Sequence, residues 1–315
     1  MHSIRTGLTV VLHSPADTEF VIVHNRTLKL AVASTPLVEL AFPTSPPAQL
    51  LGPHTPRIHA EVGRYRLRLA ETPEDRDAAC RLRFKVFNIE LNEGLASSYQ
   101  TGMDTDPYDH FCEHLLVEDK ARRRVVGTYR MQSGATAERH LGYYSEREFD
   151  FAPYEPLRAD ILELGRASID REHRTPEVLT LLWRGIAQYA NEIGLRYLIG
   201  CSSLTSKEPV EGWQMMSQLE RYRVSPEFET MPTAAYSCPR PPVGWQPPNP
   251  ADGLAVEGGV KVPKLLKTYL ALGARICGAP AWDREFGTID FLTLLDLKLL
   301  LPSARNRFLA PLASY

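Results

Sequence analysis

The order of the predicted elements indicates an α/β or α+β fold. Strand-like and helix-like segments follow one another in the order strand, helix, two strands, strand, helix, strand. Both helical segments open on a Thr-Pro pair with an acidic residue next, which is a typical helix start. The 315 residues, 43% hydrophobic and 23% charged, suit one large globular domain or one domain with an appendage.

The first strand and the first helix are expected directly after residue 64. The sequence YRLRLAE, residues 65–71, is strand-like. Thr72 then supplies a helix N-cap, and Pro73 suits the first helical turn. The residues predicted to form one apolar face of this helix are Ala79, Leu82, Val86 and Ile89.

The remaining elements of the core follow in close succession. Strands are expected at 114–119, 124–131, 160–170 and 195–201. The first two are joined by a basic turn, and the last, LRYLIGC, reads as a buried strand. Between the last two strands an amphipathic helix begins at Thr175 and ends at Gly194, a typical C-terminal glycine.

The two ends of the chain differ in composition from this core. Residues 1–60 combine short β-like runs with a proline cluster, which predicts an accessory segment and a proline-rich linker. The core is expected at 64–238. Residues 239–315 form a C-terminal extension that begins proline-rich, contains a predicted amphipathic helix at 262–277 and closes with an apolar run at 289–301.

Charge and cysteine content exclude several classes of protein. A net charge of −2 argues against a dedicated nucleic-acid binder. Five scattered cysteines without a CxxC pair indicate neither a disulfide framework nor a four-thiolate zinc site. No apolar run has the length of a signal-peptide core or a transmembrane helix. We therefore expect a cytoplasmic protein, at most peripheral at the inner face of the membrane.

The segment ILELGRASIDREHRTPEVL concentrates polar residues where a strand meets a helix. Glu163 and Arg166 lie on the predicted strand, and Arg171, His173 and Arg174 surround the helix start. A helix N-terminus can bind an anion through its backbone N–H groups and its dipole. The alternative is an ordinary solvated surface turn.

A metal site and a hydrolase triad are both poorly supported. His110, Cys112 and His114 alternate in HFCEH, so a strand would place all three on one face. Side chains in that arrangement splay apart, and the sequence offers no obvious fourth ligand. The chain also lacks a GxSxG motif. No metal is expected.

Four spaced motifs resemble those of acyl-homoserine-lactone synthases, a branch of the GNAT acyltransferase fold. The matching residues are Arg83 and Phe87, Asp106 and Asp109, Arg130, and Glu163 with Arg166. Two features depart from the pattern: Glu93 stands where a tryptophan is expected, and the glycine-rich pyrophosphate loop of ordinary GNAT enzymes is absent. This branch takes its acyl chains from acyl carrier protein.

A longer stretch, from about Tyr65 to Leu300, is similar to the ornithine Nα-acyltransferases. The resemblance is carried by RFKVFNIE, DHFCEHLLVED, ELGRASID and LGARICGAPAWDREFGTIDFLTLLDL. It implies an α+β, GNAT-like fold with a mixed central sheet flanked by helices. It also implies transfer of a long, 3-hydroxylated acyl group to the α-amine of an amino acid, L-ornithine being favoured. The donor would be the phosphopantetheine of acyl carrier protein, with no resident cofactor. The alternatives are an N-acyl amino acid synthase acting on tyrosine or glycine, and a non-catalytic GNAT-like binding protein.

The resemblance also implies roles for single residues. Glu163 is the expected base for the attacking amine, or else only an ion-pair partner of Arg166, which orients a carboxylate. The substrate-binding set comprises Arg83, Phe87, Asp106, Asp109, Arg130 and Ser202. Within it the two aspartates either hold Arg83 in place or offer carboxylates to a cationic acceptor. Ser202 would hydrogen-bond pantetheine or simply cap its strand.

Docking of the acidic carrier protein requires a basic surface. Arg171, His173 and Arg174 are the expected contacts, with Arg122–Arg124 and the lysines of the helix at 262–277 as further candidates. That helix could instead contact an anionic membrane. The C-terminal extension is expected to help form the acyl pocket.

Overall fold

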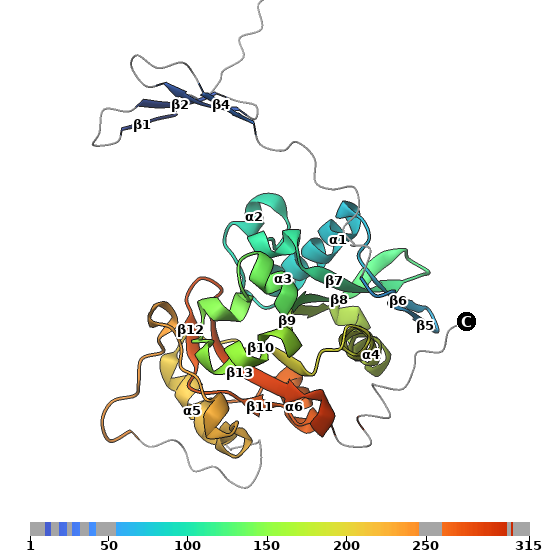
Figure 1. Cartoon of the computed structure of the whole chain (residues 1–315), viewed down its shortest axis with the longest axis vertical. Coiled ribbons are helices and arrows are strands. Elements are labelled where there is room, and N and C mark those ends of the chain that lie inside the picture. The colour runs from blue at the N-terminus through green and yellow to red at the C-terminus, as the bar shows by residue number, and fades with distance from the viewer. Residues whose placement is uncertain are drawn as a thin grey trace, which may run out of the picture. The chain divides into compact units, whose positions relative to one another are not determined.

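The computed structural model describes residues 55–245, 260–300 and 304, and the backbone of four strands nearer the N-terminus. The chain divides into two compact units, 1–48 and 49–315. The first unit is an antiparallel sheet in the order β1-β2-β3-β4 (Figure 1). Its strands are β1 (Val10–His13), β2 (Glu19–Val23), β3 (Thr27–Ala31) and β4 (Val38–Ala41). Most of the predicted proline-rich linker lies outside the described residues.

The second unit is built on a nine-stranded mixed sheet, which confirms the predicted fold class. The strand order is β11-β13-β10-β9-β8-β7-β6-β5, and β12 pairs with β13. The strands are β5 (His59–Val62), β6 (Tyr65–Leu69), β7 (Glu113–Asp119), β8 (Arg124–Ser133), β9 (Ile161–Ile169), β10 (Tyr197–Leu204), β11 (Arg275–Ile276), β12 (Ala281–Asp283) and β13 (Thr288–Asp296). The helices are α1 (Pro73–Phe84), α2 (Ser98–Thr101), α3 (Gly134–Arg139), α4 (Pro176–Glu192), α5 (Pro209–Leu219) and α6 (Lys264–Leu272).

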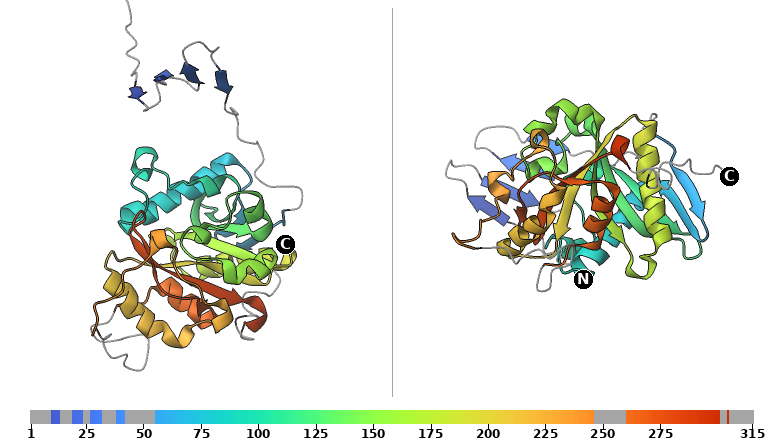
Figure 2. Two further views of the ribbon diagram at one scale, coloured as in Figure 1. Left: turned by 60° about the vertical axis from the view of Figure 1, so that its left-hand side comes forward. Right: turned by 90° about the horizontal axis from the view of Figure 1, so that it is seen from below.

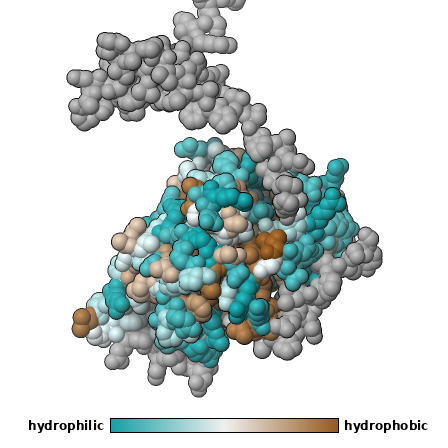
Figure 3. All heavy atoms as spheres, in the orientation of Figure 1, coloured by the Kyte–Doolittle hydropathy of each residue, from teal (hydrophilic) through white to brown (hydrophobic). Residues whose placement is uncertain are grey.

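Helices cover the sheet and close its hydrophobic core (Figure 2). α4 packs against β5 to β8, and its buried side chains join those of the strands in the largest apolar cluster. α1 contacts β7, β8 and β9. The face drawn in Figure 3 is largely hydrophilic with small apolar patches, as expected for a surface exposed to water.

The parallel pair at the centre of the sheet is short. β9 and β10 pair only from Ile161 to Glu163, and after that point the two strands separate. Gly200 lies at the separation, where an added Cβ would stand 2.2 Å from the carbonyl oxygen of Leu164. A residue without a Cβ is therefore needed where the backbones approach most closely. All other neighbouring strands in this sheet are antiparallel.

The segment after residue 260 contributes to the same sheet. Its apolar run forms β13, which pairs antiparallel with the whole of β10. The helix expected at 262–277 is shorter than predicted, because Gly273 adopts a φ of +104° and the chain then enters β11. The predicted split of 64–238 from 239–315 remains a prediction about domains. No helix in the described parts of the chain is long and apolar enough to cross a membrane.

Two local expectations are wrong. Ile89, predicted on the apolar face of the first helix, is 61% exposed, because α1 continues as a π-helical turn over Lys85–Glu90 that changes the helical period. The residues of HFCEH do not share a strand face. His110 ends a 3₁₀ turn, Cys112 lies in the following turn, and only His114 lies on β7.

Candidate active site

A cavity of about 690 Å³ opens where β9 and β10 separate. Its walls come from β8, β9, β10, the starts of α4 and α6, and the 3₁₀ turn η3 (Tyr144–Arg147). Six of the predicted site residues line it: Phe87, Arg130, Glu163, Arg166, Arg174 and Ser202. Motifs far apart in the sequence therefore meet around one space, which has the size of a typical ligand pocket.

Glu163 is buried in the wall of this cavity. Its carboxylate accepts hydrogen bonds from the backbone N–H groups of Tyr144 and Ser145, both at 2.8 Å, and from the Ser145 hydroxyl at 2.5 Å. Burial raises the pKa of Glu163, while the Ser145 hydroxyl and the two N–H groups act in the opposite direction. A carboxylate with a raised pKa, next to open space, is suited to accept a proton near neutral pH.

Arg166 does not pair with Glu163. Its guanidinium instead lies 3.1 Å from Asp106 and 3.4 Å from Asp104. Arg166 has a φ of +50° and sits in a β-bulge, where two residues of β9 oppose Tyr129 of β8. The alternative that Glu163 is only an ion-pair partner of Arg166 is therefore wrong, and the expected catalytic role of Arg166 stays a prediction.

The predicted aspartates belong to a buried network of charges. Arg83, fully buried, binds both carboxylate oxygens of Asp109 at 2.8 and 2.7 Å and one oxygen of Asp104 at 3.0 Å. Arg130 donates to Asp106 at 2.6 Å and to Asp109 at 3.2 Å. Burial opposes ionisation of Asp109, but Arg83 and Arg130 outweigh it and hold its pKa well below the ordinary value. These aspartates are neutralised within the protein, so they offer no unpaired charge to a cationic substrate.

Asp104 completes the network and was missed by sequence reasoning. It is fully buried and lies between Arg83 and Arg166. The only sequence signal was its position two residues before Asp106 in the same acidic segment.

The loop between β9 and α4 is less cationic than its sequence predicts. Glu90 pairs with Arg174 at 2.5 Å, and Glu172 lies within 3.5 Å of Arg122 and Arg124. His173 is buried, with its Nδ1 3.0 Å from the Tyr65 hydroxyl, so it cannot contact a carrier protein on the surface. The predicted carrier-binding role of His173 is corrected accordingly.

The remaining residues of the loop keep the geometry of an anion site. Arg171 is exposed, and Arg174 lines the cavity. Thr175 caps α4 by accepting a hydrogen bond from Val178, and both Thr175 and Pro176 line the cavity as well. The N-terminus of α4 therefore opens onto the same space as Glu163.

Two further predicted residues lie on the cavity wall. Phe87 packs edge-on against Phe286, with ring centroids 5.3 Å apart. Ser202 is buried, and its hydroxyl has no hydrogen-bond partner among the described residues. Ser202 also lines the cavity, so its unpaired hydroxyl is a candidate contact for a ligand.

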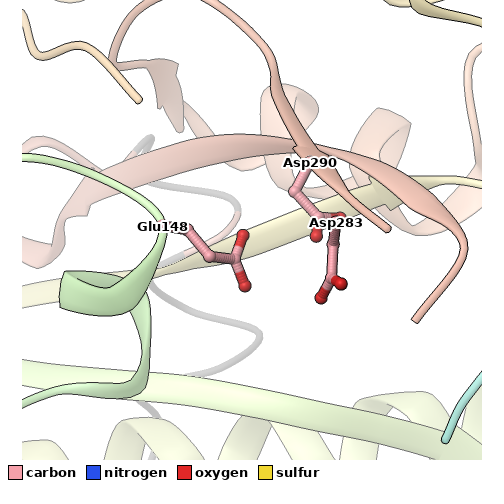
Figure 4. A group of neighbouring side chains, drawn as sticks. All are labelled: Glu148, Asp283 and Asp290. Carbon is pink, nitrogen blue, oxygen red and sulfur yellow. The ribbon is translucent and has the colours of Figure 1, made fainter. Parts of the chain in front are cut away.

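A second acidic group on the cavity wall was not predicted. Glu148, directly after η3, points toward Asp283 of β12 and Asp290 of β13 (Figure 4). The three side chains are buried, and each offers an oxygen within 4.8 Å of the other two. Sequence reasoning missed the group because Glu148 lies far in the chain from Asp283 and Asp290, and no motif joins the two segments.

Comparison with known proteins defines the class. Residues 82–184 match the model of the acetyltransferase (GNAT) domain family, a range that contains Arg83, Asp109 and Glu163. The mixed sheet and this match make the chain an acyltransferase with the GNAT fold. The alternative of a non-catalytic binding protein is thereby set aside.

Curated relatives define the family within that class. The L-ornithine Nα-acyltransferase of Brucella abortus (strain 2308) is 30% identical over 267 residues, covering 76% of this chain and 87% of the relative. The enzyme of the same name from Rhizobium meliloti (strain 1021) is 32% identical over 265 residues, covering 76% and 82%. The chain belongs to the L-ornithine Nα-acyltransferase family.

Some solved structures are partly similar to this chain. They include FeeM, an N-acyl amino acid synthase from uncultured soil microbes, with a TM-score of 0.45 and 14% identity over 79% of this chain and 97% of that one. The acyl-homoserine-lactone synthase LasI has a TM-score of 0.44 and 12% identity over 80% and 98%.

Proposed function

We propose that the protein transfers a long-chain 3-hydroxyacyl group from acyl carrier protein to the α-amine of L-ornithine, giving a lyso-ornithine lipid. The observation that carries this proposal is the cavity at the separation of β9 and β10, which has Glu163 on its wall. The ornithine acceptor is supported by the relatives named above. The donor and the hydroxylation of the chain are extensions of that similarity.

The acyl end of the donor is assigned to the gap between the two strands. A smaller cavity of about 60 Å³ shares Leu164 to Ala167 with the main one and has an apolar lining that includes Trp183, Leu198 and Leu265. Beyond Glu163 the edge of β9 has no pairing with β10, so its backbone N–H groups can donate to the thioester oxygen. The α6 helix supplies Leu265 to this wall, which supports the proposal that the C-terminal extension helps form the acyl pocket.

The proposed reaction at the thioester is amide formation. The neutral α-amine attacks the thioester carbonyl carbon, a C–N bond forms, and the C–S bond breaks with release of the pantetheine thiolate. The amine loses one proton, which Glu163 accepts directly or through a water molecule, and the thiolate takes up a proton. Ser145 and the start of η3 hold Glu163 in place for this transfer.

The carrier is assigned to the N-terminus of α4. Its phosphopantetheine phosphate would meet the backbone N–H groups there together with Arg174, while Ser202 hydrogen-bonds the pantetheine arm. The donor brings its own prosthetic group, so no resident cofactor is proposed. Arg171 is exposed on the adjoining surface and could contact the acidic carrier. The lysines of α6 could contact anionic lipid, a peripheral association at the cytoplasmic membrane face.

The test is acyl transfer by the purified full chain. It is supplied with 3-hydroxyacyl carrier protein and, separately, ornithine, tyrosine or glycine, and the products are read by mass spectrometry. The expected result is Nα-acyl-ornithine from the wild type. Acylated tyrosine or glycine in its place would overturn the acceptor, and turnover with 3-hydroxyacyl-coenzyme A but not with the carrier would overturn the donor.

A further inference from the structure

The acidic cluster of Glu148, Asp283 and Asp290 lies on the wall of the same cavity as Glu163. The three residues are between 1% and 3% exposed. Within the described part of the chain, no lysine or arginine forms an ion pair with them; the neighbouring Arg147 instead pairs with Glu285. Buried carboxylates normally have a cationic partner or a raised pKa, and the described residues give this cluster no cationic partner.

Unpartnered oxygen atoms indicate where that charge belongs. The Glu148 and Asp290 side chains share a hydrogen bond, but Glu148 Oε1 and Asp290 Oδ1 have no donor from any other described residue. Glu93 provides an independent observation: it comes from a different segment, is 8% exposed, lines the cavity, and its Oε1 also has no donor. Its charge acts on the same region, since Asp290 contributes to the raised pKa of Glu93 after burial itself. Three buried acceptors on residues that line one cavity favour a ligand that donates hydrogen bonds.

The cluster stands a short distance from the proposed base. Ser145 donates to Glu163, and Cys201 donates to Glu148 at 3.4 Å. Ser145 and Cys201 also contact one another. Two hydrogen-bonded side chains therefore separate the two carboxylates, so a small molecule with two amines could reach both.

We propose that Glu148, Asp283 and Asp290, with Glu93 beside them, bind the side-chain ammonium group of the acceptor and thereby select a diamino acid. The proposal rests on the function proposed above and assigns its acceptor subsite. An ammonium group has three N–H donors, and the cluster presents three carboxylates. The three oxygens all lie within 4.8 Å of one another, so one cationic group can contact all three carboxylates.

A divalent cation is the competing occupant. Calcium and magnesium prefer six or more oxygen ligands, including carbonyls and water. Here one oxygen of Asp283 already accepts hydrogen bonds from the N–H groups of Glu285 and Phe286, which leaves that carboxylate one oxygen for a ligand. The position in the substrate cavity and the matching number of donors favour the ammonium group.

The experiment compares two acceptors that differ only in the charged group. L-Norvaline has the carbon chain of ornithine without the side-chain amine. The variants Glu148→Gln and Asp290→Asn keep the shape of each side chain and remove its charge. Asp296→Asn is the matched control, because Asp296 lies on the same strand but pairs with Arg196 outside the cavity.

The expected result is a change in acceptor selectivity. The wild type acylates ornithine in preference to norvaline, and each cluster variant raises the KM for ornithine about 10- to 100-fold, the loss of one or more charged hydrogen bonds. In the cluster variants the KM for norvaline and the kcat stay within about 3-fold of the wild-type values. Asp296→Asn changes the KM for neither ornithine nor norvaline. The melting temperatures of the cluster variants at pH 8 are expected to equal or exceed that of the wild type, because removing one of several unpaired like charges relieves repulsion. Equal effects on both acceptors, or lower melting temperatures with unchanged selectivity, would assign the cluster a structural role and overturn the proposal.

Calorimetry keeps this inference separable from the proposed function. Ornithine and norvaline are titrated into the full chain, alone and with holo-carrier protein. If the wild type binds ornithine and the cluster variants do not, the subsite is supported even when no product forms. Absence of product in that case would count against the proposed catalytic function alone. Absence of ornithine binding and turnover, or binding of Mg²⁺, Ca²⁺ or Mn²⁺ that Asp290→Asn removes, would overturn the subsite.

Discussion

Glu163 and Arg166 lie three residues apart on β9, face the same cavity and do not form an ion pair. Glu163 is bound by the start of η3, while Arg166 reaches Asp106. On a regular strand, residues three apart point to opposite faces. The bulge at Arg166 removes that alternation and brings its guanidinium beside that of Arg130 at Asp106. Separate partners leave Glu163 available for proton transfer and Arg166 for structure.

The first prediction concerns Glu163 as the base. Glu163→Gln should lower kcat by about 10²- to 10⁴-fold, the usual contribution of a general base. The variant also turns an amide N–H₂ toward a backbone donor, so activity is to be measured below its own melting temperature. Full activity with an unchanged pH profile would show that Glu163 is not the base.

Ser145→Ala provides the matched test of the same assignment. It removes the hydroxyl that donates to Glu163 but keeps the carboxylate. Loss of a donor to the charged form raises the pKa of Glu163, so the acidic limb of the kcat profile should move to higher pH while the maximum rate is largely retained. A limb that stays in place would assign it to another group.

A further prediction concerns the buried charge network. Arg83→Met leaves Asp104 and Asp109 without their main partner in a buried setting, which is expected to destabilise the fold by about 3–5 kcal/mol. Arg122→Ala breaks an exposed pair with Glu172 and should change stability by less than about 1 kcal/mol. Urea denaturation measures both. Similar stability of the two variants would mean that the network contributes little.

The sequence predicted the fold better than the details of the site. Thr-Pro starts and apolar periodicity located α1 and α4, and the spaced motifs selected Arg83, Asp109 and Glu163, which the structure brings into one region. The unusual backbone conformation could not be predicted, because nothing in the sequence ELGRASID indicates a positive φ at Arg166. That single dihedral decides which partner Arg166 finds.

Long-range assembly was the second limit. The cluster of Glu148, Asp283 and Asp290 exists only because β12 and β13 return to pair beside β10. Its residues have no common spacing, and Asp290 lies in an apolar run that suggests core. In the sequence, Glu93 is only a departure from a motif. Its position near Asp290 in the structure is what places it beside the cluster.

The selectivity for ornithine should depend on pH. Burial and the charge of Asp283 raise the pKa of Asp290 to about 6, although its hydrogen bonds act in the opposite direction. Burial and the charges of Asp290 and Asp283 raise the pKa of Glu148 well above its ordinary value. Both groups gain negative charge as the pH rises through and above 6, while the ornithine side chain stays protonated. The ratio of kcat/KM for ornithine to that for norvaline should therefore rise between pH 5.5 and pH 8.

Taking the ratio removes effects common to both acceptors, such as deprotonation of the α-amine and of Glu163. The other titratable groups near the cluster are Glu93, the phenols of Tyr144 and Tyr236, whose pKa values burial raises, and the thiol of Cys201. Burial raises the pKa of that thiol well above its ordinary value, so it stays neutral over this range. Asp290→Asn should flatten the profile near pH 6. A ratio that falls with pH would contradict a carboxylate site for the ammonium group.

The last prediction tests whether the separation of β9 and β10 creates the cavity. In Gly200→Ala the new Cβ would stand 2.2 Å from the Leu164 carbonyl oxygen, closer than real atoms approach, so the backbones must move apart at the last paired residues. Overpacking of this kind costs about 1–3 kcal/mol and should widen the start of the gap that we assign to the thioester, with a loss of kcat. Gly165→Ala is the control for the added methyl group, because an added Cβ there meets no atom within 4 Å. It should leave stability nearly unchanged and, because Gly165 lines both cavities, affect chiefly the KM for the acyl donor. If Gly200→Ala melted and turned over like the wild type, close approach at Gly200 would not be what positions the strands, and the gap would have to be held open by the helices beside it.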